Sequence, residues 1–593
     1  MSRASRDETL AAPTPRAARS LLALASVAVA FAAADTYVVV LALPDMMGTV
    51  KLPISELQRA APIISGFLLG YVAMLPLIGR IADLRGRVPV LVMSLVVFSL
   101  GSLITALTFD MTTMVAGRFL QGVGGGGLVP ATLALVADLY PVHRRGVPLG
   151  VVSAVQEIGS VLGPLFGALV LAVAPWQAIF AINVAIGLLL AVLIHLLTRR
   201  GSGGQSEAQA PPRERPGWRR FDWLGLLAAL VAVGAFCILA IRPAEIQRDL
   251  TWGQIFIPYT GESRWVTPIG VTVVGACLVL LLRCWFARRP LVDVRAWGRS
   301  MVEADLTGAL LLAAALSGVI LAFATADPEV QVFSELGPWY LAASAVAAVL
   351  FAVHLSRADA PLFPRRALRA VPAWGSLLVS FLIGAALIAA LIDIPIFART
   401  TIHRESQLMA ALVLVRFLVA LPVGAVVGGW LTRRLPSGVV TALGMVLAGI
   451  AFLLMTGWDA DTLRHASSTA TLLLCGLGFG LALAPVNAAL LASTDDDVHG
   501  VASAMVVVAR MIGMLVGISA LTTWGLRRFA DARDACLAAG RDGCGTEAAL
   551  AQEHTVFLGA AVCAFAAAAL AVVLFRGART RELDTGVLLR SGG

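Results

Sequence analysis

Residues 79–87 read Gly-Arg-Ile-Ala-Asp-Leu-Arg-Gly-Arg and form a short charged loop between two long apolar segments. The two glycines of the loop allow a tight turn. The carboxylate of Asp83 is expected near a helix N-terminus, where the helix macrodipole favours a negative charge. Because the loop is basic, the simplest alternative is an ordinary loop on the inner face of a membrane. Both interpretations place a membrane helix on either side.

The composition of the whole chain also indicates a membrane protein. Of its 593 residues, 59% are hydrophobic and 14% are charged. Soluble domains cannot bury so much apolar surface. The net charge of +9 does not indicate nucleic-acid binding, because the excess arginines lie in short loops between apolar runs. The sequence therefore predicts an all-α polytopic membrane protein.

Apolar segments long enough to cross a bilayer, which takes about 20 helical residues, recur along the chain. Sixteen of them are expected, at 20–46, 56–80, 88–109, 111–140, 147–174, 177–198, 222–242, 266–286, 303–326, 337–356, 372–397, 407–431, 437–457, 469–493, 499–527 and 553–577. With this count, arginines concentrate in the loops assigned to the cytoplasm, apart from the acidic loop 494–498. We therefore predict sixteen spans, with fourteen as the alternative, and both termini in the cytoplasm.

An internal repeat divides the segments into two related halves. Three landmarks recur at offsets of 350 to 358 residues: Asp35 with Asp393, Gly79 with Gly429, and the Gly-rich run 122–130 with 476–485. Such repeats are typical of transporters built from two bundles. The predicted organisation is a cytoplasmic tail, a six-helix bundle, a cytoplasmic linker, four inserted central helices, a second six-helix bundle and a cytoplasmic tail, at 1–19, 20–198, 199–221, 222–370, 371–578 and 579–593.

Two charged residues of the first half are candidates for a functional pair. Arg118 lies within a spanning segment, where a charge is costly unless it is paired or faces water. Asp35 is the expected partner, because both residues lie at depths that long side chains can bridge. A buried carboxylate beside an arginine can exchange a proton with a gradient. The alternative is a purely structural ion pair.

Glu157 is a third charge inside a segment and also needs a partner. Arg510 lies at a similar depth in the second half, whereas Arg416 lies nearer the outer face. We therefore favour a Glu157–Arg510 pair between the two bundles, broken in one conformation and formed in the other. A static core ion pair is the alternative.

Several further residues are weaker candidates. Gln121, Asp393 and Arg416 are expected to line a cavity, and Pro395 is expected to break the helix that carries Asp393. Residues 495–497 are three aspartates that we interpret as the start of a helix and not as a metal site. Cys536 and Cys544 lie in a long outer loop, where an oxidising compartment permits a disulfide. No metal or cofactor is expected.

Three motifs together resemble the drug:proton antiporter family of the major facilitator superfamily. They are the 79–87 loop, the pattern Arg118-x-x-Gln121-Gly122, and the run 157–167, which is similar to the antiporter signature of helix five. The resemblance implies alternating access with export driven by a proton gradient. It also implies a latch at Gly79, Asp83 and Arg87, and an antiporter motif at Gly159, Gly163, Pro164 and Gly167 that suits a hinge-like domain contact or simple tight packing. This family normally has fourteen helices, so four central helices are a departure from it.

Within the family, residues 35–40, 156–164 and 507–511 resemble a mycobacterial group of triacylglyceride and multidrug efflux pumps that work with a periplasmic lipoprotein. This resemblance implies a monomeric transporter in a bacterial inner membrane, with hydrophobic drugs or lipids as substrates and a lipid-carrier lipoprotein as a partner. A membrane enzyme of lipid metabolism is a rival hypothesis, but the seven histidines form no catalytic cluster. A non-transporting membrane sensor is a second rival.

Overall fold

A computed structural model describes most of the chain, and the described residues form helices joined by short turns, without strands. The described ranges are 15–52, 61–141, 144–202, 222–249, 251–261, 263–287, 290–324, 336–358, 361–362, 369–402, 407–495, 498–540 and 544–578. Both predicted tails and nearly all of the predicted linker lie outside these ranges, apart from residues 15–19 of the first tail and residues 199–202 at the start of the linker.

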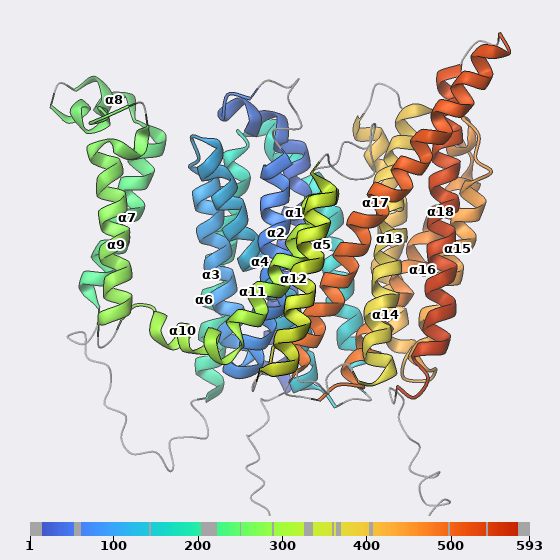
Figure 1. Cartoon of the computed structure of the whole chain (residues 1–593), viewed down its shortest axis with the longest axis horizontal. Coiled ribbons are helices and arrows are strands. Elements are labelled where there is room, and N and C mark those ends of the chain that lie inside the picture. Colours follow the sequence, from blue (N-terminus) through green and yellow to red (C-terminus); the bar gives the residue numbers. More distant parts are fainter. Residues whose placement is uncertain are drawn as a thin grey trace, which may run out of the picture.

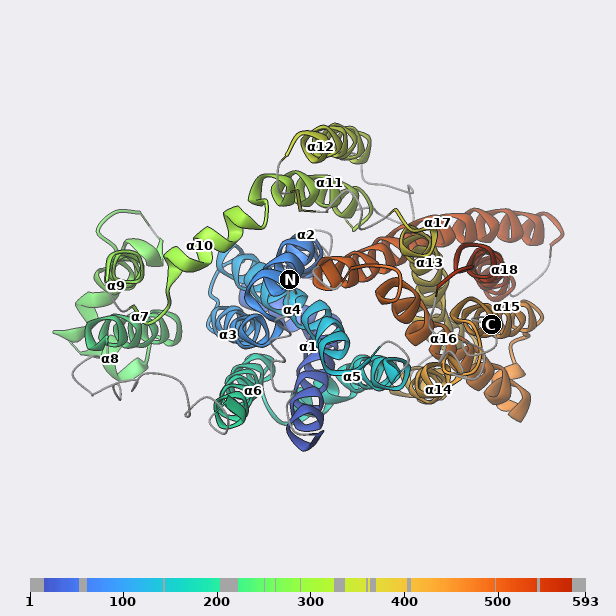
Figure 2. The same cartoon turned by 90° about the horizontal axis from the view of Figure 1, so that it is seen from below.

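Two six-helix bundles lie side by side (Figure 1). The N-terminal bundle contains α1 (Pro15–Thr49), α2 (Ala61–Arg85), α3 (Arg87–Ala106), α4 (Met111–Leu139), α5 (Gly146–Val173) and α6 (Gln177–Ser202). The C-terminal bundle contains α13 (Val371–Thr400), α14 (Gln407–Leu431), α15 (Ser437–Met455), α16 (Ala466–Leu491), α17 (His499–Ala538) and α18 (Cys544–Leu574). The two bundles meet face to face when the molecule is viewed from below (Figure 2).

Further helices connect the bundles. They are α7 (Trp223–Ile241), the short α8 (Ala244–Arg248), α9 (Pro268–Phe286), α10 (Val294–Glu303), α11 (Leu306–Ala324) and α12 (Gly337–Arg357). The α11–α12 hairpin packs on α2 and α17, whereas the α7–α9 hairpin stands outside α3 (Figure 2). The α10 helix crosses below them and bends by 75° into α11 (Figure 1).

Each of the sixteen predicted segments coincides with one of these helices. Fourteen helices of the described residues are long and apolar enough to cross a membrane, and the bent pair α10–α11 would be a fifteenth. The 28-residue α5 is not among the fourteen, although it packs along α1 within the bundle. The multi-pass, all-helical fold is therefore confirmed, while the full count of sixteen stays a prediction.

The expected break at Pro395 is wrong. The α13 helix continues through Pro395 to Thr400. Proline removes one backbone hydrogen bond. Membrane helices tolerate this loss where neighbouring helices hold the segment in place, and α13 packs against α17 and α18.

The two central hairpins share one design. Asp222 precedes α7 and accepts hydrogen bonds from the backbone N–H of Gly225 (3.0 Å) and from Arg283 at the end of α9 (2.5 Å). Asp305 precedes α11 and accepts in the same way from the N–H of Gly308 (2.9 Å) and from His354 at the end of α12 (2.7 Å). The α7–α9 and α11–α12 hairpins are therefore closed by the same type of contact between their helix ends.

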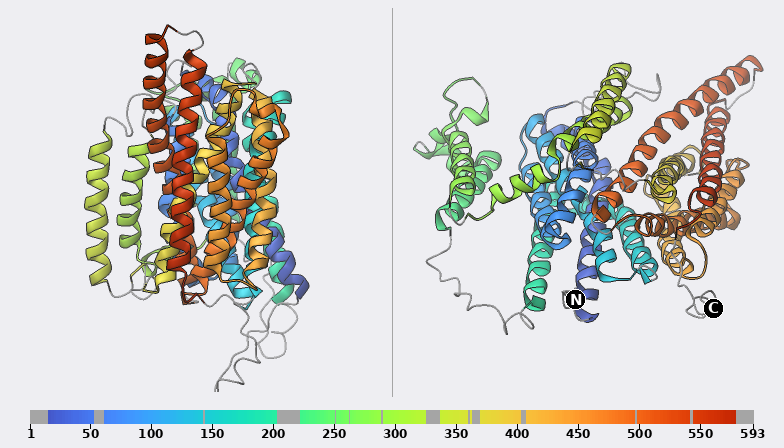
Figure 3. Two further views of the ribbon diagram at one scale, coloured as in Figure 1. Left: turned by 90° about the vertical axis from the view of Figure 1, so that its right-hand side faces the viewer. Right: turned by 60° about the horizontal axis from the view of Figure 1, so that its bottom comes forward.

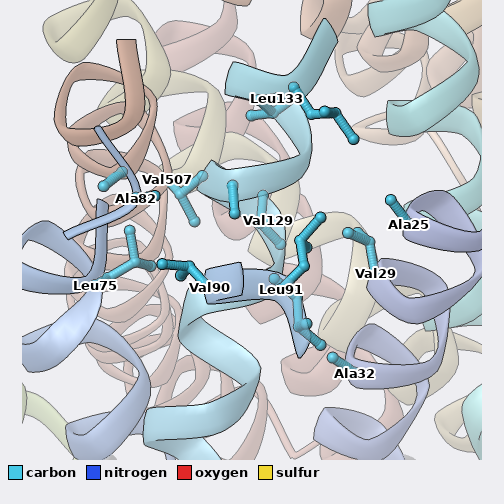
Figure 4. Packing of buried hydrophobic residues seen from close by; sticks show 14 of the residues in the cluster. Ala25, Val29, Ala32, Leu75, Ala82, Val90, Leu91, Val129, Leu133 and Val507 are labelled. Atoms are coloured by element: carbon cyan, nitrogen blue, oxygen red, sulfur yellow. The ribbon is translucent and has the colours of Figure 1, made fainter. Parts of the chain in front are cut away.

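The apolar core of the N-terminal bundle extends into the second half. Buried side chains of α1, α2, α3 and α4 form one cluster with residues of α16 and α17 (Figure 4). Figure 4 labels Val507 of α17 among the residues of this cluster, together with Leu75 and Ala82 of α2. The C-terminal helices, including other residues of α16 and α17, form a separate core. The halves are thus joined by shared packing near the start of α17.

The two last helices project beyond the others at the opposite end from this contact (Figure 3). Their tip is closed by a disulfide between Cys536 and Cys544, with Cα atoms 5.6 Å apart. The predicted disulfide is therefore confirmed. It closes a loop of only eight residues, so it fixes the tip and places no constraint on the bundle.

Candidate functional site

Asp35 and Arg118 form a buried ion pair in the N-terminal bundle. The Nη1 atom of Arg118 lies 2.8 Å from Oδ2 of Asp35, and the side chains are 1% and 0% exposed. The predicted pairing is therefore confirmed. Removing either partner would leave an uncompensated charge in an apolar surrounding, so the pair constrains how α1 and α4 can pack.

Neutral groups complete the bonding of this pair. Asn183 of α6 donates to the second oxygen of Asp35, and Arg118 also donates to Gln121. Gln121 in turn donates to the hydroxyl of Ser102 in α3 at 2.9 Å. The ring of Phe67 lies 4.4 Å from the guanidinium, close enough for a cation–π contact. Asn183 and Ser102 were not predicted. For Asn183 the sequence does contain a signal, because its amide side chain interrupts an apolar run.

The loop between α2 and α3 connects the two bundles. Asp83 accepts hydrogen bonds from the backbone N–H groups of Gly500 (2.8 Å) and Val501 (3.1 Å) at the start of α17. The helix N-terminus expected near Asp83 is therefore present, and it belongs to the other half of the chain. Backbone donors and the α17 macrodipole both favour the charged carboxylate.

Arg87 and Gly79 support this contact. Arg87 lies 3.0 Å from Asp83 and 3.3 Å from Asp138 of α4, so it holds the carboxylate from within its own bundle. A Cβ atom on Gly79 would lie 2.6 Å from the carbonyl oxygen of Gly500, which is closer than real side chains approach. Glycine at this position therefore allows α2 and α17 to come into backbone contact.

The small residues of α5 face two different neighbours. Gly159 and Gly163 lie directly against the backbone of Ala30 and Ala34 in α1, with no room for a side chain. The motif thus packs tightly within its own bundle. A separate glycine, Gly146 at the start of α5, makes the close contact with the other bundle, at Gly429 of α14. The side chain of Pro164 lies outside the described part, and Gly167 is buried in α5.

A cavity lies between the two bundles. Its lining comes from six different helices and from both halves, and consists of Val29, Ala32, Ala33, Tyr71, Val129, Gln156, Ser160, Leu387, Arg510, Met511 and Met514. Most of this surface is apolar, and a single charged side chain, Arg510, contributes to it. The two methionines add flexible apolar contacts that can adapt to different molecules.

For the predicted Glu157–Arg510 pair, the structure describes the side chain of Arg510 only. Arg510 lines the cavity, and Gln156 and Ser160 line it from α5. Glu157 follows Gln156 on that helix, but its side chain lies outside the described residues. The pair therefore stays a prediction.

The three predicted cavity residues lie elsewhere than in this lining. Gln121 bonds Arg118 inside the N-terminal bundle, and Arg416 donates to Thr469 at 3.0 Å. Asp393 is buried in the C-terminal bundle, 4% exposed. The described residues hold no cluster of metal-ligating side chains. Asp495 precedes α17, as expected for a helix start, while residues 496–497 lie outside the described ranges.

Two six-helix halves, a shared cavity and a backbone latch between α2 and α17 define a transporter of the major facilitator type. The family model of the Major Facilitator Superfamily matches residues 25–518, and the chain belongs to this superfamily. The superfamily comprises transporters, which confirms that the chain is not an enzyme.

Individual members of the superfamily are similar to the chain over most of its length. A triacylglyceride transporter of Mycolicibacterium hassiacum is 36% identical over 513 residues, covering 85% of this chain and 78% of that protein. A triacylglyceride transporter of Mycobacterium tuberculosis is 32% identical over 526 residues, covering 86% and 83%. The predicted family resemblance is therefore confirmed. Among solved structures, the human organic anion transporter MFSD10 shares the fold with a TM-score of 0.50 at 13% identity, covering 92% of this chain and 99% of that one.

Proposed function

We propose that the chain exports hydrophobic compounds in exchange for protons, with triacylglycerides and similar neutral lipids as the main substrates. The observation that carries this proposal is the apolar cavity between the two bundles. An apolar lining with few polar groups selects molecules by hydrophobicity and gross shape. The names of the mycobacterial relatives support a lipid substrate, and hydrophobic drugs would fit the same lining.

Alternating access requires that contacts between the halves open at one end and close at the other. Asp83 with the start of α17, and Gly146 with Gly429, hold the halves together at the end that the arginine distribution assigns to the cytoplasm. In the proposed cycle this end opens to load substrate and closes before release. Release to the outer side would then meet the predicted periplasmic lipoprotein.

The proposed coupling uses the buried charges. Protonation of Asp35 would end its attraction for Arg118 and change the packing of α1 against α4. Glu157 and Arg510 would form an ion pair across the cavity in one state and separate in the other. Both steps link proton binding to helices that line the cavity, namely α1, α5 and α17.

Transport by the purified full chain in liposomes tests this function. A fluorescent triacylglyceride and a cationic dye are loaded separately, and an imposed pH gradient is applied with and without a protonophore. We expect gradient-driven movement of the lipid that the protonophore abolishes, and its loss in the Asp35→Asn variant. Movement of both compounds at the same rate without a gradient would refute the antiport mechanism.

A further inference from the structure

Two carboxyl groups are buried together in the C-terminal bundle, away from the cavity. Asp393 of α13 is 4% exposed and Glu553 of α18 is 1% exposed. The two helices that carry these groups, α13 and α18, pack against each other. The Oε2 atom of Glu553 is buried and has no hydrogen-bond partner among the described residues.

The surroundings of this pair are apolar and aromatic. One helical turn after each carboxylate lies a buried ring, Phe397 and Phe557, with centroids 6.3 Å apart. Trp458 packs on Phe397 at 5.4 Å. Apolar rings offer no compensation for a negative charge, and an isolated ionised carboxylate in such a place is very costly.

No described cation on the neighbouring helices offsets the charge. Arg510 of α17 lines the central cavity, and Arg416 of α14 donates to Thr469. The ring of His554 on α18 contacts the carbonyl oxygen of Trp458. Arg399 of α13 and the α17 arginines at 527 and 528 are exposed. Helices α15 and α16 contain no Asp, Glu, His, Lys or Arg.

We propose that Asp393 and Glu553 form a second proton-binding site, in which two buried carboxyl groups share one proton. Two adjacent carboxylates without a cation cannot both ionise, so one proton is retained near neutral pH. The site belongs to α13 and α18, whereas Asp35 and Arg118 belong to the first bundle. As a step in transport the inference rests on the proposed proton coupling, and it raises the number of protons exchanged per substrate.

Infrared difference spectroscopy on the full chain in nanodiscs tests the site directly. The isosteric variants Asp393→Asn and Glu553→Gln imitate the protonated form, so both are expected to fold. At pH 7 the spectrum of wild type minus the double variant should contain a protonated carboxyl stretching band. The same-helix variant Glu547→Gln, at an exposed position, should lose only a carboxylate band. Loss of only carboxylate bands in the double variant would overturn the shared-proton site.

The proton-to-substrate ratio of liposome transport tests the role in exchange. We expect the double variant to exchange one proton fewer per substrate than wild type. An unchanged ratio would overturn the coupling role and leave a structural proton. If wild-type transport proves independent of the gradient, the proposed function fails and the coupling role fails with it, while the infrared band still decides whether the pair holds a proton.

Discussion

The carboxylate of Asp83 is hydrogen-bonded at 2.8 Å to the backbone N–H of Gly500, a residue 417 positions further along the chain. This bond joins the end of α2 in one bundle to the start of α17 in the other. It uses a backbone donor, so its strength depends on the position of the whole α17 helix. A shift between the bundles must therefore break it.

Replacing Gly79 by alanine should hold this contact open. The new Cβ would lie 2.6 Å from the carbonyl oxygen of Gly500, and both groups belong to helix backbones that cannot yield separately. We expect a longer spin-label distance between the ends of α2 and α17, together with slower transport. Gly275→Ala is the matched control, because open space surrounds that glycine. An unchanged distance in Gly79→Ala would contradict the latch.

Breaking the Asp35–Arg118 pair should destabilise the protein strongly. Arg118→Met leaves the Asp35 carboxylate buried without a cation, which typically costs about 3–5 kcal/mol. Thermal unfolding in detergent measures this loss. The exposed pair of Arg464 and Asp461, with side chains 68% and 66% exposed, provides the control, and Arg464→Met should change stability little. If both substitutions reduce the stability equally, burial is not the reason why the Asp35–Arg118 pair stabilises the protein.

The Glu157–Arg510 pair should be tested by exchanging its charges. We expect Glu157→Gln to abolish transport while expression and folding remain intact, because the protonatable group is gone. The double variant Glu157→Arg/Arg510→Glu restores an ion pair with reversed polarity, and it should recover stability relative to either single reversal. Full transport by Glu157→Gln would exclude this residue from the coupling route. Arg416→Met serves as a control, since that arginine bonds Thr469.

The α7–α9 hairpin should weaken in acid. The hydrogen bond from Arg283, followed by that from the N–H of Gly225, holds the pKa of Asp222 below its usual value. A lowered folded-state pKa stabilises above the unfolded value of about 4, and this contribution disappears as the pH falls through the folded value. The protection of the Gly225 amide against hydrogen exchange, relative to an unstructured amide at the same pH, should therefore fall at low pH in wild type. In Asp222→Ala, which removes the acceptor of the Gly225 N–H, this protection should be low already at neutral pH; identical protection in both proteins would contradict the prediction.

The helices were predictable from sequence because a bilayer demands long apolar segments, and each expected segment coincides with a helix. The α10 helix was missed because it is short and amphipathic, so it does not resemble a membrane span. It contacts the latch loop, where Arg85 donates a hydrogen bond to Ser300 of α10 at 2.6 Å. The Asp222 and Asp305 caps depend on contacts between helix ends, which hydropathy does not report.

The candidate site was predictable where a charge interrupts an apolar segment, as with Asp35 and Arg118. Partners that are neutral, such as Asn183, or that belong to the backbone, such as the N–H of Gly500, carry too weak a signal. Glu553 was missed for another reason. The predicted segment begins only at 553, whereas α18 begins at Cys544 and buries Glu553 within the bundle.

The 40-residue α17 helix acts as a lever across the membrane. At about 1.5 Å per residue it is roughly 60 Å long, with the N–H groups that bind Asp83 near one end and Cys536 near the other. A tilt of roughly 10° about the latch would displace the disulfide-closed tip by about 10 Å. The position of this tip on the far side of the membrane therefore reports whether Asp83 is bound to the start of α17.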